Sequence, residues 1–256
     1  MMKKTQFYSV ILFIMVIGFW EAIVHFKRIS KLILPAPSDI VVNLLHHFQS
    51  GYFYPHIMVT SIEVFGGFFV GAVLGIGLGF IVAQSKIAQE ILQPYIIASQ
   101  AMPKLALAPL LVLWFGFGYT PKIVIVALVC FFPLFESTVT GLSYVSREKL
   151  ALFRSLRATS FQTLIKLRLP TAMPYIFSGL RVAVVLSVVG AVVSEFIGAN
   201  KGLGALIIAS QGMLDTTLMF SVFILLTVKG LLLYQIIYWI EAIFFKKYMF
   251  SRGKLK

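Results

Sequence analysis

Charged side chains interrupt several apolar stretches of this sequence, and such residues are the first candidates for chemistry. Lys229 lies twelve positions into an apolar segment, and Glu136 lies thirteen positions into another. A charge at mid-bilayer costs roughly 2.5 to 3.5 kcal/mol on insertion scales, so intramembrane charges are functional candidates. At about 1.5 Å per residue the two side chains lie roughly 18 and 20 Å below the ends of their segments. These matching depths predict a Lys229–Glu136 ion pair or a shared solvated cavity.

Three further ionisable residues lie within or near the ends of apolar segments. Lys104 is expected to approach the cavity, and two lysines against one carboxylate would make it net positive, which favours anionic or electron-rich molecules. Glu195 and Glu63 fall near the outer ends of their segments, where we expect water to reach them readily. The candidate pathway residues are therefore Lys104, Glu136, Lys229 and Glu195.

Motifs of several enzyme classes are absent from the sequence. No stretch matches the phosphate-binding G-x-x-x-x-G-K-[ST], and neither G-x-S-x-G nor H-E-x-x-H occurs. All four histidines precede residue 57, so we expect no histidine metal site among the later segments. Cys130 is the only cysteine, which excludes an intrachain disulfide. We expect a non-catalytic chain that binds no cofactor and no metal of its own.

The composition indicates which elements must hold these residues. Of the 256 residues 59% are hydrophobic and 12% are charged, against roughly 45 to 50% apolar residues in soluble domains. A spanning helix needs about 20 mostly apolar residues. Six windows meet this need, at residues 7–24, 57–83, 91–115, 123–143, 172–197 and 217–240. The sequence predicts an all-α, polytopic membrane protein with six transmembrane helices.

The basic residues predict the orientation of these spans. The net charge of +13 could indicate a nucleic-acid partner, but its distribution follows the membrane rule that Lys and Arg stay in inner loops. Five basic residues fall in outer segments: Lys27, Arg28, Lys31, Lys122 and Lys201. Fourteen fall in inner segments: Lys3, Lys4, Lys86, Arg147, Lys149, Arg154, Arg157, Lys166, Arg168, Lys246, Lys247, Arg252, Lys254 and Lys256. We expect both termini in the cytoplasm, no nucleic-acid partner and an uncleaved first helix.

Proline and glycine mark special positions along the chain. Pro94, Pro103 and Pro109 interrupt the third predicted span. Ser38 is expected to cap a short amphipathic helix whose apolar stripe repeats at residues 41, 44, 45 and 48; this helix lies on the outer membrane face or simply packs as a loop helix. A ridge of small residues repeats every four positions in the second span, at Gly67, Gly71, Gly75 and Gly79. Such a ridge brings two helices close together, either within the chain or between two subunits.

The longest inner connection, residues 144–171, is both basic and amphipathic. Apolar Leu150, Phe153, Leu156 and Leu167 alternate with lysines and arginines. A loop that only sets orientation needs charge but no apolar anchors. The pattern therefore predicts helices that dock into a groove of a partner protein.

The loop and the start of the next predicted span contain LRATS at 156–160, LRLP at 167–170 and PYIFSGLR at 174–181. These motifs resemble the cytoplasmic signature of bacterial binding-protein-dependent ABC permeases. Further matches are LPAPS at 34–38, PKLALAPL at 103–110, WFGFG at 114–118, EFIG at 195–198 and GLG at 202–204. Together they extend from residue 34 to the last span. The subgroup resembled is the nitrate, sulfonate and taurine type, with relatives for thiamine-pyrimidine precursors and riboflavin.

The resemblance implies a function and a set of partners. It implies the permease subunit of an ABC importer for a small organic or anionic solute, in the bacterial inner membrane. Two permease subunits would form the pathway, a separate ATPase subunit would bind ATP and Mg, and an external binding protein would deliver the solute. The residues implied in ATPase coupling are Leu152, Phe153, Leu156, Arg157, Ala158, Thr159, Leu167 and Pro170. Glu63 stands where sulfonate-type relatives are expected to have arginine, which favours the pyrimidine and riboflavin relatives.

One part of the signature departs from the family pattern. Counting back from Pro170, the family's acidic-Ala-Ala positions fall at residues 151–153, and its glycine falls at Arg157. Because arginine resists the left-handed conformation that glycine permits, we expect a longer, straighter coupling helix or a different docking geometry.

Two rival functions and a domain division complete the predictions. An ATP-independent secondary transporter or channel would copurify with no ATPase, and a membrane scaffold would support no solute flux. We divide the chain into a first helix with its external segment at 1–56, the permease domain at 57–243 and a basic cytoplasmic tail at 244–256.

Overall fold

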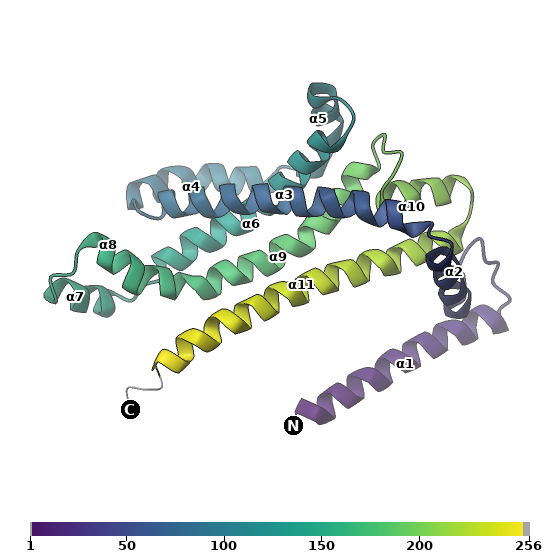
Figure 1. The fold of residues 1–256 in the computed structure, drawn as a ribbon, viewed down its shortest axis with the longest axis horizontal. Helices are drawn as coiled ribbons and strands as arrows, with labels where there is room; N and C mark the ends of the chain where they lie inside the picture. Colours follow the sequence, from purple (N-terminus) through teal and green to yellow (C-terminus); the bar gives the residue numbers. More distant parts are fainter. Residues whose placement is uncertain (1, 253–256) are drawn as a thin grey trace. The chain divides into compact units, whose positions relative to one another are not determined.

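The computed structural model describes residues 2–252, with the side chains of this range except 2–6, 93, 97, 100 and 246–252. Every regular element in this range is a helix (Figure 1). The longer helices are α1 (Met2–Phe26), α2 (Pro37–Gln49), α3 (Phe53–Val82), α4 (Lys86–Ala101), α6 (Tyr119–Ser143), α9 (Leu169–Glu195), α10 (Leu203–Gly212) and α11 (Thr216–Arg252). The shorter ones are η1 (Lys104–Leu107), α5 (Ala108–Phe115), α7 (Arg147–Ser155), α8 (Ser160–Thr163) and the π-helical turn η2 (Leu164–Arg168). The predicted all-α class is confirmed. The last four residues of the predicted tail lie outside the described residues.

Five of the described helices are long and apolar enough to cross a membrane. They are Phe7–Phe26, Phe53–Val82, Tyr119–Ser143, Ser160–Glu195 and Thr216–Phe245. The third predicted span is divided instead among α4, η1 and α5, because the chain leaves the helix at Met102 and Pro103. Proline lacks the amide hydrogen that would continue the helix. The chain is a polytopic membrane protein, and the count of six spans stays a prediction.

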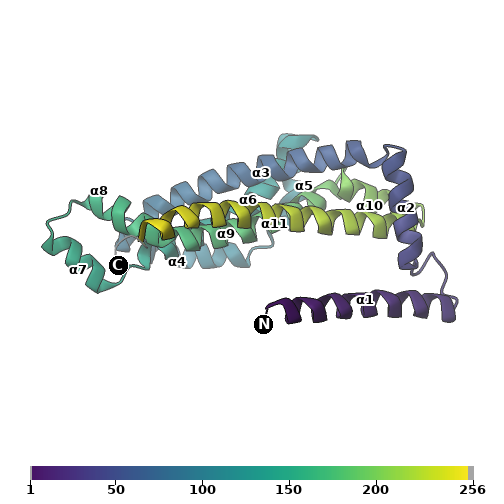
Figure 2. The same cartoon turned by 60° about the horizontal axis from the view of Figure 1, so that its bottom comes forward.

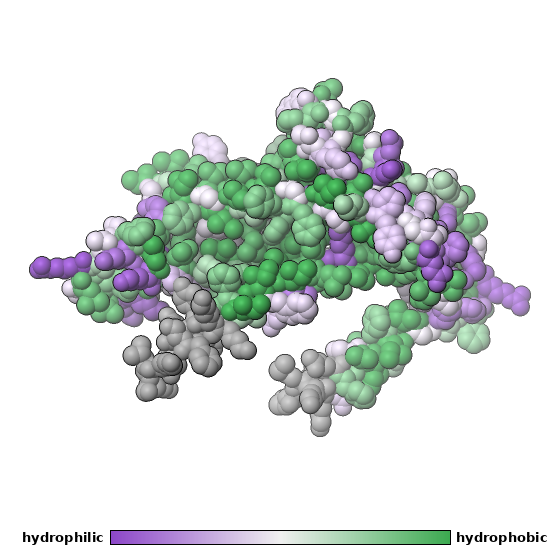
Figure 3. All heavy atoms as spheres, in the orientation of Figure 1, coloured by the Kyte–Doolittle hydropathy of each residue, from purple (hydrophilic) through white to green (hydrophobic). Residues whose placement is uncertain are grey.

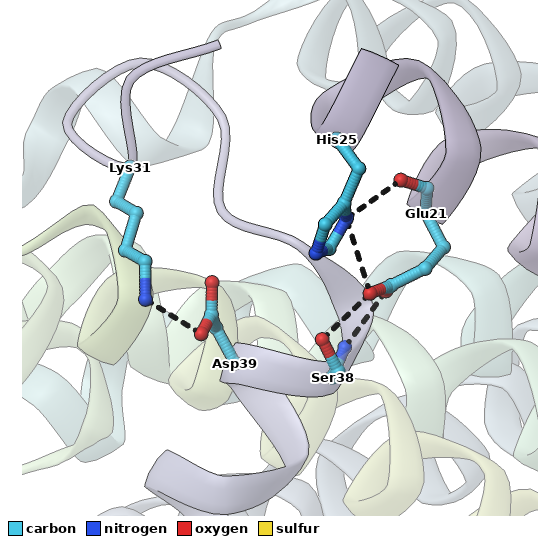
Figure 4. Close-up of polar contacts among 5 residues, drawn as sticks. All are labelled: Glu21, His25, Lys31, Ser38 and Asp39. Atoms are coloured by element: carbon cyan, nitrogen blue, oxygen red, sulfur yellow. Dashed lines mark hydrogen bonds and ion pairs between the residues drawn. The ribbon is translucent and has the colours of Figure 1, made fainter. Parts of the chain in front are cut away.

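The chain divides into two compact units, and the first contains residues 1–59 and 200–227. Within it, the end of α1 is tied to the start of α2 by polar contacts (Figure 4). The Glu21 carboxylate accepts hydrogen bonds from the Ser38 amide at 3.0 Å and the Ser38 hydroxyl at 2.7 Å, and Lys31 Nζ lies 2.7 Å from an oxygen of Asp39. The indole of Trp20 packs on Phe220 of α11.

The predicted amphipathic helix is present as α2, but its cap differs from the prediction. The helix begins at Pro37 after Ala36, and the hydroxyl of Ser38 donates to Glu21 instead of capping α2. Proline suits the first helical position because its missing amide hydrogen has no partner there. Val41 of the predicted apolar stripe is exposed, whereas Ile40 is buried. The position of α2 at the membrane surface stays a prediction.

The second unit contains residues 60–199 and 228–256, and α6 lies between α3 and α9 in its interior (Figures 1 and 2). The glycine ridge of α3 rests on the backbone of α6. A methyl group at Gly71 would lie 2.7 Å from the carbonyl oxygen of Ala127, and one at Gly75 would lie 2.7 Å from that of Phe131. Helices this close gain dispersion and weak C–H···O contacts. The ridge thus joins two helices of one chain.

The other side of α6 is packed against α9 in the same manner. A methyl group at Gly179 of α9 would lie 2.7 Å from the side chain of Ser137. The thiol of Cys130, which is fully buried, donates to the carbonyl oxygen of Ala183 at 3.2 Å. Small residues on α3 and α9 therefore hold α6 in place from two sides. Side chains on the three helices are positioned by this close packing.

Candidate functional site

A group of buried polar side chains joins four helices of the second unit. We call it the buried polar cluster, and it consists of Thr60, Ser61 and Glu63 on α3, Lys122 on α6, Glu195 on α9 and Lys229 on α11. Thr60, Glu63, Lys122 and Glu195 are each less than one-tenth exposed. Because buried charges are stable only when they are paired and hydrogen-bonded, these residues constrain how the helices can meet.

An ion pair between α3 and α6 forms the centre of the cluster. Lys122 Nζ lies 2.7 Å from Oε1 of Glu63. The sequence had placed Lys122 in an outer connection, which is wrong because α6 begins three residues earlier, at Tyr119. Pro121 stands in the first turn of α6, where proline is tolerated. A proline that appears to precede a span can therefore lie inside it.

The two glutamates lie in a drier environment than the sequence predicted. Glu63 is fully buried and Glu195 is 1% exposed, so ready access of water to both is contradicted. The hydroxyl of Thr60 donates to Oε1 of Glu195 at 2.6 Å. For Glu63 the reason is the early start of α3 at Phe53, which puts this residue roughly 15 Å along the helix at 1.5 Å per residue. Glu195 does stand at the end of its helix, as the last residue of α9, and is nonetheless buried.

Lys229 joins this cluster instead of pairing with Glu136. Its Nζ donates to the hydroxyl of Ser61 at 2.9 Å, and the carboxylates of Glu195 and Glu63 act on its charge. Among the described side chains no ion pair joins Lys229 to Glu136. The cause is position along α6: fourteen residues, or roughly 21 Å of helix, separate Glu136 from Lys122. Depths counted from predicted helix ends cannot show which level of a neighbouring helix a residue faces.

Lys104 has a different environment from the cluster lysines. It is the first residue of η1, and its Nζ lies 4.4 Å from the centre of the Phe132 ring on α6. An ammonium group over an aromatic face is a cation–π contact. Phe131 packs edge-on against Phe132, with ring centres 4.9 Å apart. Of the four predicted pathway residues, the structure brings Glu195 and Lys229 together, while Lys104 faces an aromatic surface.

Sequence reasoning missed Thr60, Ser61 and Lys122 as members of the site. One signal was available, because Thr60 and Glu63 are three residues apart and thus share a face of one helix. Two polar residues at this spacing inside an apolar segment indicate a polar contact with another helix. The identity of that contact depends on the rotation of α6, α9 and α11, which local sequence does not define.

The loop between α6 and α9 forms a second candidate site. Ser146 caps α7, and Thr159 caps α8 in a reciprocal capping box with Gln162. Leu152, Leu156 and Phe161 are 56%, 69% and 69% exposed. Figure 3 shows hydrophilic side chains gathered at this end of the second unit and hydrophobic ones over its long helices. The loop thus presents apolar side chains among basic ones.

Of the two alternatives expected for the coupling segment, the longer, straighter helix is wrong, and a different docking geometry stays a prediction. Helix α7 ends at Ser155, and Arg157 adopts a φ of 52°, in the left-handed region. The amide of Arg157 donates to the carbonyl of Arg154, and that of Ala158 donates to the carbonyl of Phe153. This pair of bonds is the Schellman motif, which usually has glycine at its left-handed residue. The turn is therefore retained with arginine in glycine's place.

A comparison with family models decides the class of protein. Residues 71–249 match the model of the binding-protein-dependent transport system inner membrane component. This match covers α6, both loop helices α7 and α8, and α9. The chain belongs to this family. It is a multi-pass permease of the inner membrane, a transmembrane subunit of an ABC transport system.

Curated relatives resemble the permease over most of its length. A probable ABC transporter permease protein of Haemophilus influenzae is 34% identical, with 86% of this chain and 89% of the relative covered. The riboflavin transport system permease protein RibX of Chloroflexus aurantiacus is 34% identical over 84% of this chain and 81% of its own length. The formylaminopyrimidine transport permease protein ThiX of Halalkalibacterium halodurans is 33% identical, with coverage of 86% and 87%.

Solved structures show the same fold. A crystal structure of an amino acid ABC transporter with histidines matches with a TM-score of 0.61 and 18% identity, over 80% of this chain and 97% of the other. An inward-facing structure of the MetNI methionine ABC transporter matches with a TM-score of 0.60 and 18% identity, over 74% and 93%. At 18% identity this similarity shows only that the folds are alike.

Proposed function

We propose that this permease is the pathway subunit of an ATP-driven importer, and that its α7–α8 loop docks on a separate ATPase. The observation that carries the proposal is the exposure of Leu152, Leu156 and Phe161 in a loop that is otherwise basic. Large apolar side chains exposed together indicate a protein interface. ATP and Mg bind to the ATPase, and the permease itself contributes no catalytic group and holds no cofactor.

The local structure of the loop supports docking. The serine cap, the Schellman motif and the capping box satisfy the backbone groups at the ends of α7 and α8. The loop therefore keeps its shape while its apolar side chains remain exposed. A rigid surface binds with less loss of conformational entropy than a flexible one. Such a loop can transmit a movement of the ATPase to α6 and α9.

The test is copurification of the ATPase with Leu156→Asp. Burying an aspartate in an apolar groove costs several kcal/mol, so we expect loss of the ATPase from the purified complex and loss of solute uptake. Met213→Asp is the matched control, because Met213 is 76% exposed and follows α10 rather than lying in the loop. Retention of the ATPase by Leu156→Asp would contradict docking through this loop, whereas absence of any ATPase from the purified wild-type permease would favour a transporter that works without ATP.

The charges of the buried polar cluster bear on the solute. Lys122 and Lys229 are matched in formal charge by Glu63 and Glu195. The net positive cavity was expected from Lys104 and Lys229 against Glu136. Because Lys229 belongs to this charge-balanced cluster, the argument for an anionic solute is weakened. Lys104 over Phe132 offers instead an aromatic surface beside an ammonium group. An electron-rich ring can stack on such a surface.

We therefore infer a small heterocyclic solute of the pyrimidine or flavin kind rather than a sulfonate. The names of the riboflavin and formylaminopyrimidine relatives support this choice. Competition for uptake in cells that express the whole transporter tests it. Riboflavin or a formylaminopyrimidine should compete with the solute, whereas taurine should not. Competition by taurine alone would reverse the assignment.

The proposal also covers the assembly of the permease and its orientation in the membrane. We propose a permease homodimer, with both termini in the cytoplasm and an external binding protein that delivers the solute. The bias of Lys and Arg toward the inner segments supports this orientation. A single reporter cysteine at residue 3 of a Cys130→Ala background tests it, because the reporter should react only with a permeant reagent in intact cells. A reaction with an impermeant reagent would place the N-terminus outside.

A further inference from the structure

We propose that Arg181 and Glu241 couple α11 to α9, so that a movement of the α7–α8 loop reaches the end of α11. Helix α9 follows this loop directly, because residues 160–195 form one continuous helical segment. Arg181 of α9 forms an ion pair with Glu241 of α11, and both side chains are less than one-quarter exposed. Such coupling requires the docking of the loop on the ATPase that is proposed above.

A second contact between the same two helices lies one turn away. Phe177 of α9 is buried, and its ring centre lies 5.9 Å from that of Phe244 and 6.2 Å from that of Phe245. Phe177 precedes Arg181 by four residues, and on α11 the two rings follow Glu241 by three and four residues. Residues at these spacings share a face of a helix. Two successive turns of α9 therefore contact two successive turns of α11.

The ion pair makes the register of these two helices specific. Apolar side chains alone can exchange one set of contacts for a similar one when a helix slides. A slide of α11 by one turn, roughly 5.4 Å, would separate the carboxylate from the guanidinium. It would leave two charges without partners in membrane-spanning helices, where such charges are costly. We therefore expect α11 to move together with α9 instead of sliding along it.

Both α9 residues of this contact belong to the motif PYIFSGLR at 174–181. In the same motif Gly179 lies against α6, where a methyl group would be 2.7 Å from the side chain of Ser137. One short segment of α9 thus contacts α6 through its glycine and α11 through a phenylalanine and an arginine. This segment can transmit a displacement that arrives from the loop to two helices at once.

Helix α11 has another polar contact farther from the loop. Lys229 donates to Ser61 of the buried polar cluster at 2.9 Å. It precedes Glu241 by twelve residues, or roughly 18 Å of helix. A movement that enters α11 at the ion pair can therefore be carried along this helix to the cluster. Arg181 and Glu241 act through α11, which makes them positioning residues.

The experiment is spin-label spectroscopy of the permease purified with its ATPase, in lipid nanodiscs. A reporter cysteine replaces either Val182 of α9 or Ile243 of α11 in a Cys130→Ala background, because both side chains are exposed. Trapping the ATPase with ATP and vanadate should change the spectra of both reporters. In Glu241→Arg, which brings two like charges together, the response at 243 should be lost and that at 182 retained. Adding Arg181→Glu restores opposite charges and should restore the response at 243.

The reporter at 182 is the control for folding and docking, because a misfolded variant would lose both responses. If Glu241→Arg does not fold, Glu241→Gln replaces it and should weaken the response at 243 alone. A response at 243 that persists unchanged in the folded single variant would overturn the coupling, and so would a double variant that stays silent there. The wild type is a test without any change to the pair. Silence at 243 with the ATPase present refutes the coupling alone, whereas a wild type that retains no ATPase refutes the docking function as well.

Discussion

Two regions of the permease handle apolar surface in opposite ways. Where α3, α6 and α9 meet, glycines have no side chain and let the helices approach each other closely. The apolar surface of each helix is there covered by another helix of the same chain. In the α7–α8 loop, Leu156 and Phe161 keep large side chains exposed on a well-capped backbone. The first region is covered within one chain, whereas the second, in the function proposed above, is covered by the ATPase. A substitution in the first should therefore change stability, and one in the second should change assembly.

The largest effect on stability is expected from Lys122→Met. Removing one partner of a buried ion pair costs about 3 to 5 kcal/mol, because the remaining charge is left without compensation. The variant should unfold at a markedly lower temperature in detergent than the wild type. Adding Glu63→Gln removes the stranded charge and should restore much of the loss. If the double variant were as unstable as the single one, the ion pair would not be the source of the effect.

A smaller effect with a matched control comes from the glycine ridge. Gly71→Ala puts a methyl group 2.7 Å from the carbonyl oxygen of Ala127, so α3 and α6 must separate. Overpacking of this kind costs about 1 to 3 kcal/mol. Gly77 lies on the same helix with no atom near its side-chain position, and Gly77→Ala should be neutral or gain up to about 1 kcal/mol of helix propensity. Thermal melting of the two variants should move in opposite directions.

The sequence predicted the parts of this fold that depend on local pattern. Apolar windows located α1, α3, α6, α9 and α11, because a spanning helix needs a fixed length of apolar residues. Pro103 predicted the break in the third span, because proline lacks an amide hydrogen, but Pro94 lies inside α4 without breaking it. The spacing of Gly67, Gly71, Gly75 and Gly79 predicted a close helix contact. It left open which helix makes that contact, and the structure gives α6.

The buried polar cluster was harder to predict, since its members come from four helices. Lys229 was recognised as costly in a membrane, but its acceptor is Ser61, which lies 168 positions earlier in the sequence. A partner on another helix depends on rotation and on relative level, and an error of a few residues at a helix end changes both. The early starts of α3 and α6 were such errors. They moved Glu63 and Lys122 from expected water into the protein interior.

The smallest effect is expected at Arg157, where the loop departs from its family pattern. Arginine holds the left-handed conformation there, at a cost of roughly 1 to 2 kcal/mol relative to a right-handed residue. Arg157→Gly removes this cost but makes the unfolded chain more flexible, so we expect a net gain of about 1 kcal/mol or less. Arg154→Gly is the control, because it lies inside α7 and should lose about 1 kcal/mol.

The Arg157→Gly variant also tests whether the charge of Arg157 contributes to binding of the ATPase. If Arg157 serves only the turn, Arg157→Gly should bind the ATPase as well as the wild type does, because Leu156 and Phe161 keep their positions. If its charge contributes to docking, the binding of Arg157→Gly should be weaker at low salt and approach that of the wild type at high salt, because surface charges are screened there. Measuring copurification at two salt concentrations separates the backbone role of this residue from its charge. The apolar contact through Leu156 should show little dependence on salt in either variant.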